Sequence, residues 1–172
     1  MTDLETCLSD NRRAVKAFLA DARAAPPSLW AQPRAPGKWS PGQVAEHVAL
    51  AYELSRGLLH GSFPGKAAPR ILRPIIRTFF LNPVLKRGRF GPGNKTPEPF
   101  EPAESTAAPN TLIARLEAAV GAFETDFVAS ARTGRATIDH PFFGKVPLAD
   151  YARLQAIHTE HHRQQLLSAN AT

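Results

Sequence analysis

The last long segment of the chain, residues 148–168, combines a helical repeat of apolar positions with three closely spaced histidines. Side chains four residues apart on an α-helix differ by only about 40° of rotation, so His158 and His162 lie on one face. Core-type residues at helical spacing share that face, whereas His161 turns toward its flank. The segment predicts a helix whose inner face directs two imidazoles at one point. The residues on this inner face form a stripe along the helix: Tyr151, Leu154, Gln155, His158, His162 and Gln165.

Two imidazoles at this spacing form a bidentate clamp for a metal ion, but a catalytic divalent ion usually takes three protein ligands. His47 is the best candidate for the third, because it shares a helical face with Val44 and Val48. The competing interpretation of each inward histidine is a hydrogen-bonded core residue. The pair His158 and His162 also lacks the intervening Glu of a zincin motif. The residues alone leave both interpretations open.

Four segments carry the apolar periodicity of long α-helices, and no segment predicts a convincing strand. Their connections are rich in proline. Four helices joined in this way predict an all-α four-helix bundle, in which facing helices can build a metal site from inward side chains. The predicted helices span residues 3–24, 40–59, 110–132 and 148–168.

The second of these helices has the clearest start. Ser40 is a good N-cap, Pro41 suits the first helical position, and Gln43 completes a capping box. Asn110 is expected to cap the third helix. These signals place His47 in the second turn of its helix.

The net charge of +6 is unevenly distributed, because no Asp or Glu occurs between Leu54 and Pro97. This basic block could attract an anionic ligand, a membrane surface or nucleic acid, but no nucleic-acid fold signature accompanies it, and we expect no nucleic-acid partner. A solvated basic face is the competing interpretation. The cations of the block are Arg56, Lys66, Arg70, Arg73, Arg77, Lys86, Arg87, Arg89 and Lys95.

Within the basic block, residues 70–81 are strongly apolar as well as basic, and Pro74 limits them to a short or kinked helix. Such a piece could lie on a membrane, cover the bundle or pack across a dimer interface, and packing is our expectation. We expect a homodimer, because the segment carries more apolar side chain than one helix edge normally hides. A long, irregular connection follows over residues 82–109.

Several side chains could border the predicted metal site. If residues 61–109 fold over the open end of the bundle, anchored by Phe90 and Phe100, then Arg87 and Arg89 could receive a carboxylate-bearing ligand.

Three further side chains are candidates for the surroundings of the metal. Gln165, on the stripe of His162, could orient the site or satisfy backbone groups. His140 precedes Pro141 and is expected in extended conformation, where it either reaches the mouth of the site or makes a local hydrogen bond. His161 is the third candidate, on the flank of the last helix.

A chain of 172 residues, with 43% hydrophobic and 21% charged residues, is long enough for a proper core, so we expect residues 1–172 to form one domain. Cys7 is the single cysteine, so the chain cannot form an internal disulfide, and this suits a reducing cytoplasm. We expect Cys7 to be a small core residue. No stretch approaches the length of a membrane span, and the N-terminus lacks signal-peptide features. We expect a soluble, cytoplasmic protein without a transmembrane segment.

Three stretches together resemble the DinB-like superfamily, in particular a bacterial branch with a His-Pro-x-Phe-Gly element. They are residues 37–47 (GKWSPGQVAEH), residues 140–146 (HPFFGKV) and His158-x3-His162 with Gln165 and Leu166. The similarity covers most of the chain and is loosest between residues 61 and 109. It implies a four-helix bundle of DinB/YfiT type with a short extra helix and a long proline-rich connection.

The resemblance also implies a ligand set. In this superfamily a histidine of the second helix and a His-x-x-x-His pair of the last helix hold a divalent metal ion, commonly nickel or zinc. Carried over by position, the ligands are His47, His158 and His162.

The resemblance leaves the reaction open, and no catalytic side chain follows from it. The superfamily includes metal-dependent transferases that use low-molecular-weight thiols, a mycothiol-dependent maleylpyruvate isomerase, and members without demonstrated activity. Our first hypothesis is a metal-dependent transferase that uses a low-molecular-weight thiol as cosubstrate. The alternatives are a metal-dependent hydrolase and a stress-associated protein whose metal only braces the bundle, which would require a fourth protein ligand.

Overall fold

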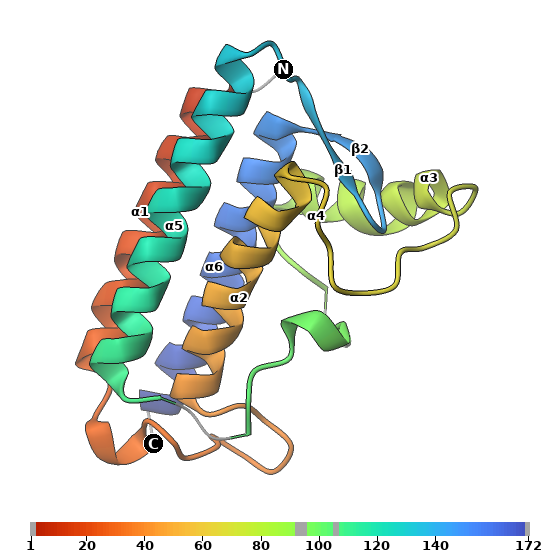
Figure 1. Ribbon diagram of the computed structural model, residues 1–172. Helices are drawn as coiled ribbons and strands as arrows, with labels where there is room; N and C mark the ends of the chain where they lie inside the picture. The colour runs from red at the N-terminus through yellow and green to blue at the C-terminus, as the bar shows by residue number, and fades with distance from the viewer. Residues whose placement is uncertain (1–2, 92–95, 105–106, 171–172) are drawn as a thin grey trace.

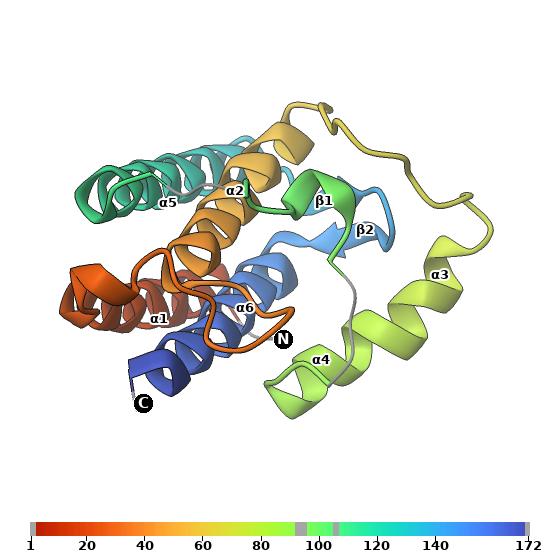
Figure 2. The same cartoon turned by 90° about the horizontal axis from the view of Figure 1, so that it is seen from below.

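The computed structural model describes residues 3–91, 96–104 and 107–170. Within these ranges four long helices form a bundle, and the fold predicted from the sequence is confirmed. They are α1 (Leu4–Ala24), α2 (Pro41–Leu59), α5 (Pro109–Arg132) and α6 (Leu148–Asn170). The main pairs are α1 with α6 and α2 with α5, while α2 also packs on α6 (Figure 1 and, from below, Figure 2).

Helix α2 begins as its sequence predicts. A 3-10 turn, η1 (Pro27–Leu29), precedes it, and the capping box is complete. Ser40 Oγ accepts from the Gln43 backbone N–H at 3.2 Å, and Gln43 Oε1 accepts from the Ser40 N–H at 3.0 Å. Two N–H groups that would otherwise lack partners at the helix start are thus satisfied.

Helix α5 begins differently from the prediction. Asn110 is not its cap, because Pro109 occupies the first helical position and Ala108 precedes it without a side-chain bond. Proline is already set at the dihedral angle of a helix start and has no N–H to satisfy, so the helix begins one residue earlier.

The side chain of Tyr52 contacts the three other long helices from the centre of the bundle. It lies on α2 and is fully buried. Its hydroxyl donates to Asn11 Oδ1 on α1 at 2.7 Å and shares a second hydrogen bond with Thr159 Oγ1 on α6 at 2.8 Å. Its ring meets Phe123 on α5 edge to face, with 5.3 Å between ring centres. One side chain therefore ties all four helices together.

A β-hairpin connects α5 to α6, and the expectation of no strand was wrong. Its strands, β1 (Thr137–His140) and β2 (Gly144–Pro147), pair antiparallel. Ile138 and His140 are buried and Asp139 is exposed, the alternation of a half-buried strand. Gly144 adopts φ +67, where other residues are strained. The pattern escaped prediction because the alternation lasts only four residues.

A second helical segment stands to one side of the bundle (Figure 2). It runs through α3 (Arg73–Ile76), a π-helical turn η2 (Arg77–Leu81) and α4 (Asn82–Arg87). Pro74 lies in the first turn, where its missing N–H costs little.

The expected short extra helix is therefore present, but the connection after it is more regular than predicted. Besides α4, it contains a 3-10 turn, η3 (Glu98–Phe100). Pro83 does not break the helix, because it follows the π-helical residues, where the regular bonding ladder is already interrupted. Lys95, the last cation of the basic block, lies outside the described residues.

We call residues 70–87, which contain α3, η2 and α4, the projecting segment. It packs on the bundle through one side only. Leu81 and Val84 are buried and anchor it, whereas Ile71 and Phe79 are 82% and 79% exposed. The bundle therefore covers only part of the apolar surface for which packing was predicted. The predicted homodimer itself stays a prediction. None of the described helices is long and apolar enough to cross a membrane.

Replacing Tyr52 with phenylalanine should destabilise the fold by about 1–3 kcal/mol, because Asn11 Oδ1 and the Thr159 hydroxyl would be left buried without this partner. Urea denaturation followed by circular dichroism measures the change. Exposed Thr78, mutated to Ala, serves as a control and should shift the midpoint little. An unchanged midpoint for Tyr52→Phe would show that the hydrogen bonds do not hold the bundle.

Candidate metal centre

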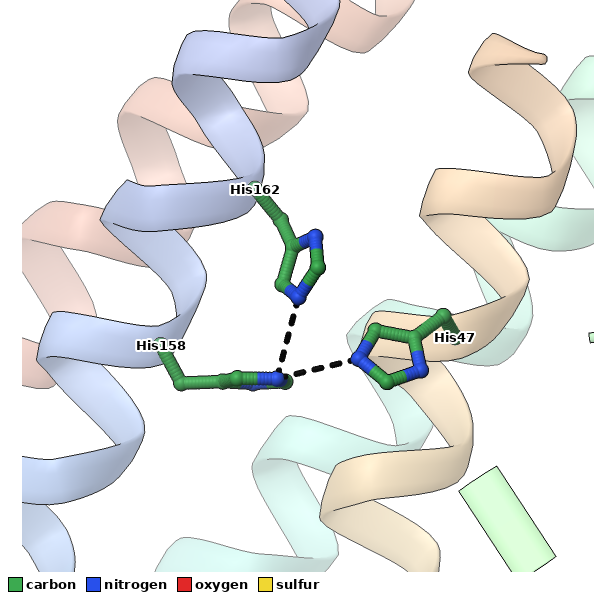
Figure 3. A group of neighbouring side chains, drawn as sticks. All are labelled: His47, His158 and His162. Atoms are coloured by element: carbon green, nitrogen blue, oxygen red, sulfur yellow. Dashed lines mark hydrogen bonds between the residues drawn. The ribbon is translucent and has the colours of Figure 1, made fainter. Parts of the chain in front are cut away.

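Three imidazoles from two helices meet at one point (Figure 3). His47 comes from α2, and His158 and His162 come from successive turns of α6. The Nε2 atom of His158 lies 3.0 Å from that of His47 and 3.1 Å from that of His162. Nitrogen ligands that each lie about 2.1 Å from one ion are themselves roughly 3–4 Å apart. All three ligand atoms lie within 4.8 Å of one another, so the three histidines could hold a single divalent ion. The three residues predicted as ligands are thus brought together.

Hydrogen bonds on the far side of two rings fix their tautomers. His47 Nδ1 donates to the backbone carbonyl of Phe100 at 2.6 Å, and His162 Nδ1 donates to Gln165 Oε1 at 3.1 Å. With the proton on Nδ1, the Nε2 lone pair of each ring is available to a metal. The Nδ1 atom of His158 is buried and has no hydrogen-bond partner within the described parts of the chain.

The three histidines are held neutral by their surroundings. Burial lowers the pKa of His47 to about 4. Burial also lowers the pKa of His158 and of His162 well below the ordinary value, and the neighbouring histidines add to the effect. A histidine must be unprotonated to bind a metal, so the site is ready to do so at neutral pH.

The structure reveals contributions from Trp39 and Phe100 that the sequence interpretation missed. The ring centre of Trp39 lies 4.8 Å from that of His47 and 6.1 Å from that of His162. Phe100 supplies a backbone carbonyl, for which no side-chain pattern exists. A clue to Trp39 was available, because it directly precedes the Ser40 cap of the helix that carries His47.

The long connection reaches the centre through Phe90 as well. Its ring lies 5.8 Å from that of His158 and 5.5 Å from that of His161. Aromatic side chains from two separate loops, Phe90 and Trp39, therefore border the imidazoles. Folding of this connection over the histidines agrees with the prediction that Phe90 and Phe100 anchor it.

The other side chains that were predicted to border the metal site fall into two groups. Gln165 and His161 form the first group and lie beside the three histidines. Besides accepting from His162, Gln165 donates through Nε2 to His161 Nε2 at 3.3 Å. His161 is half-buried on the flank, as predicted. Burial, and then the charge of Arg34, lowers the pKa of His161. Arg34 is a cation near the site that the sequence interpretation did not include.

His140 and the two arginines form the second group. His140 Nδ1 accepts from the Phe142 N–H at 3.2 Å, and its ring stacks on Phe143 at 4.4 Å. It therefore makes the local hydrogen bond of the simpler interpretation. Arg87 and Arg89 are exposed. Their predicted role toward a carboxylate stays a prediction.

A fourth protein ligand is absent from the cluster, as far as the described residues extend. Cys7 lies in the core on α1, and burial raises the pKa of its thiol. A structural metal site is usually closed by four protein ligands, whereas a catalytic site keeps one position open. The donor set of His47, His158 and His162 has the second form.

Comparison with known proteins places the chain in a family and a fold. Residues 8–166 match the sequence model of the DinB superfamily. The structure of TT2238, a four-helix bundle protein, aligns with a TM-score of 0.61 at 24% identity, over 96% of this chain and 98% of the other. YfiT from Bacillus subtilis, described as a probable metal-dependent hydrolase with an unusual four-helix bundle topology, aligns with a TM-score of 0.59 at 15% identity, over 97% of this chain and 85% of the other. No curated protein matches the chain. At these identities the solved structures establish the fold alone.

Buried His140 makes the stability of the metal-free protein depend on pH. Burial, with a smaller effect of Arg73, lowers its pKa to about 3. The unfolded chain therefore takes up this proton near pH 6.5 while the folded chain does not, so stability should fall as the pH decreases from about 6.5. Between pH 6.5 and 4.5 this one group should contribute a loss of about 2–3 kcal/mol. Urea denaturation after chelator treatment measures it.

Two variants separate the effect of His140 from that of the other histidines. His140→Gln should reduce the loss of stability between these pH values. His60→Gln serves as the control, because the His60 side chain is 68% exposed. Equal pH dependence of wild type and His140→Gln would contradict the assignment.

Proposed function

Because the chain belongs to the DinB superfamily, we propose that His47, His158 and His162 hold a divalent metal ion and that the protein is a metal-dependent enzyme. The observation that carries the proposal is the convergence of three neutral Nε2 atoms without a fourth ligand among the described residues. Imidazole ligands suit zinc and nickel, which are the metals we propose.

The surroundings of the three histidines favour a small nucleophile in the open position. A bound divalent ion would lower the pKa of a water or a thiol, so that a nucleophile forms at neutral pH. The protein itself supplies no thiol, because Cys7 is buried in the core. Trp39 and Phe90 border the imidazoles with aromatic surfaces, against which sulfur packs favourably. These features support a transferase that takes a low-molecular-weight thiol as cosubstrate.

Hydrolysis is the second candidate. The description of YfiT as a probable metal-dependent hydrolase favours it, since the two chains share a fold. Water would then take the position assigned to the thiol. A metal that only braces the bundle is a weaker candidate, because the described cluster has three ligands rather than four.

Two broader proposals accompany this function. We propose that residues 1–172 form one domain, because the long helices all pack into one bundle. We also propose a cytoplasmic location, since the single cysteine, Cys7, is free and buried.

The metal content of purified protein tests the ligand assignment. Chelator-treated wild-type protein offered zinc or nickel should retain about one equivalent after gel filtration, because three imidazoles fill most of a catalytic coordination shell. His158→Ala should retain much less, whereas His161→Ala should retain as much as wild type. Elemental analysis measures the content, and circular dichroism checks that each variant folds. Equal metal content in His158→Ala and wild type would exclude His158 as a ligand.

The same proteins distinguish the two candidate reactions. Metal-loaded wild type is incubated with a panel of thiols and electrophiles, and separately with esters and amides. Thiol adducts that wild type forms and His158→Ala does not would support the transferase. Product released without any thiol would support the hydrolase. A metal-loaded protein inactive in both panels would contradict the enzymatic proposal.

Gln165 should strengthen metal binding by orienting His162. Gln165→Leu removes the acceptor of the His162 Nδ1 proton, and the loss of such a partner typically weakens metal affinity about 10–100-fold. Gln164→Leu is the matched control, because Gln164 is exposed and bonds Glu160 instead. Competition with a metal indicator dye measures both affinities. If Gln165→Leu binds the metal as tightly as Gln164→Leu, then the Gln165 amide does not orient His162 for metal binding.

A further inference from the structure

The projecting segment bears an apolar surface that the bundle does not cover. Ile75 and Phe79 lie in α3 and η2, and Ile71 lies in the turn that leads into α3. Their exposed fractions are 82%, 53% and 79%, and neighbouring Leu72 is 44% exposed. Large apolar side chains grouped in this way on a protein surface usually mark an interaction site. We call this surface of Ile71, Leu72, Ile75 and Phe79 the apolar ridge.

A basic cleft lies on the same segment, where it faces the β-hairpin. The cleft has a volume of about 480 Å³ and contains four cationic side chains and a single carboxylate, Asp139. Its cations are Arg70, Arg73, Arg77 and Lys145.

Two of these arginines are held in place by the chain itself. Arg73 donates through Nε to the Ala68 carbonyl at 3.0 Å and faces Asp139 at 3.4 Å. Arg77 donates to the Lys145 carbonyl at 2.5 Å. Arg70 and the Lys145 side chain are exposed and can reach a ligand outside the cleft.

We propose that residues 70–81 dock this protein on the surface of an anionic lipid bilayer. The apolar ridge enters the boundary between headgroups and acyl chains, and the two exposed cations of the basic cleft, Arg70 and Lys145, bind lipid phosphates. Interfacial helices combine apolar and cationic side chains in this manner. Arginine and lysine have long stems, which let their charges reach the headgroups while neighbouring apolar side chains insert. Docking uses none of the three histidines, so the proposal is independent of the proposed enzymatic function.

The charge of this surface favours a bilayer over the other partners considered. A second copy that covered the ridge would place its own Arg70, which directly precedes Ile71, at the same interface, and Asp139 is the one carboxylate that lines the cleft. The neighbouring sequence cannot neutralise these cations, since residues 54–97 contain no Asp or Glu. Nucleic acid would satisfy the cations, but its phosphates offer nothing to Ile71, Ile75 and Phe79. An anionic bilayer offers acyl chains to the ridge and phosphates to Arg70 and Lys145, whose long stems let their charges reach the headgroups.

Sedimentation with lipid vesicles tests the proposal on the full chain. Wild-type protein should sediment with vesicles of equal parts phosphatidylcholine and phosphatidylglycerol, and much less with phosphatidylcholine alone. Added salt should weaken the binding, because it screens the cations. Failure to bind the anionic vesicles at low salt would overturn the proposal.

Matched variants assign the binding to the ridge and the cleft. Two double variants should each weaken vesicle binding at least about tenfold. Ile75→Ser/Phe79→Ser removes two of the four apolar side chains of the ridge, and Arg70→Gln/Lys145→Gln removes two of the four cations of the cleft. Lys16→Gln/Arg132→Gln removes the same charge from exposed positions on α1 and α5 and should bind as wild type does. Circular dichroism confirms folding. If Arg70→Gln/Lys145→Gln and Lys16→Gln/Arg132→Gln lose the same amount of vesicle binding, then only the net charge of the protein matters. That result would overturn the proposal.

Light scattering and a DNA-binding assay cover the other partners. A dimer that Ile75→Ser/Phe79→Ser converts to a monomer would assign the ridge to a second copy. Binding to duplex DNA that exceeds binding to anionic vesicles would assign the cleft to nucleic acid. Either result would overturn membrane docking, whereas a monomer that binds vesicles and not DNA would support it.

Discussion

The hydrogen bond between Tyr52 and Thr159 fixes α2 against α6, and the arrangement of the three imidazoles depends on it. Thr159 directly follows His158, and Tyr52 lies on the same helix as His47. A slide of either helix would leave a hydroxyl buried without its partner, which is costly in a low-dielectric core. The same contact therefore sets the register that brings the imidazoles of α2 and α6 to one point.

How far the sequence predicts this protein depends on the range of each interaction. Within one helix, the period of 3.6 residues was enough to place His158 and His162 together, and local bonding was enough to place the Ser40 cap. The residues alone left His47 open, because its partner His158 lies 111 positions away and helix periodicity says nothing about which helices face each other. The family resemblance supplied that pairing, and the geometry agrees with it.

Other features had a weak signal in the sequence or none. The carbonyl of Phe100 that orients His47 is a backbone atom, so any residue type could provide it. The hairpin strands are too short for a clear alternation, and α4 contains Pro83, which usually argues against a helix. The long connection, expected as an irregular cover, in fact supplies both Phe100 and Phe90 to the centre. The least regular part of the chain thus carries a share of the site, as is common for loops on a rigid scaffold.

The wide separation of the three histidines along the chain has a consequence for when the proposed metal ion could bind. During synthesis, His47 emerges long before His158 and His162, and Phe100 must also be in place before His47 is oriented. An incomplete chain offers no three-nitrogen site to the metals around it. The three nitrogens meet only when α2 and α6 have packed, so selection of the proposed metal would fall to the finished fold rather than to the nascent chain.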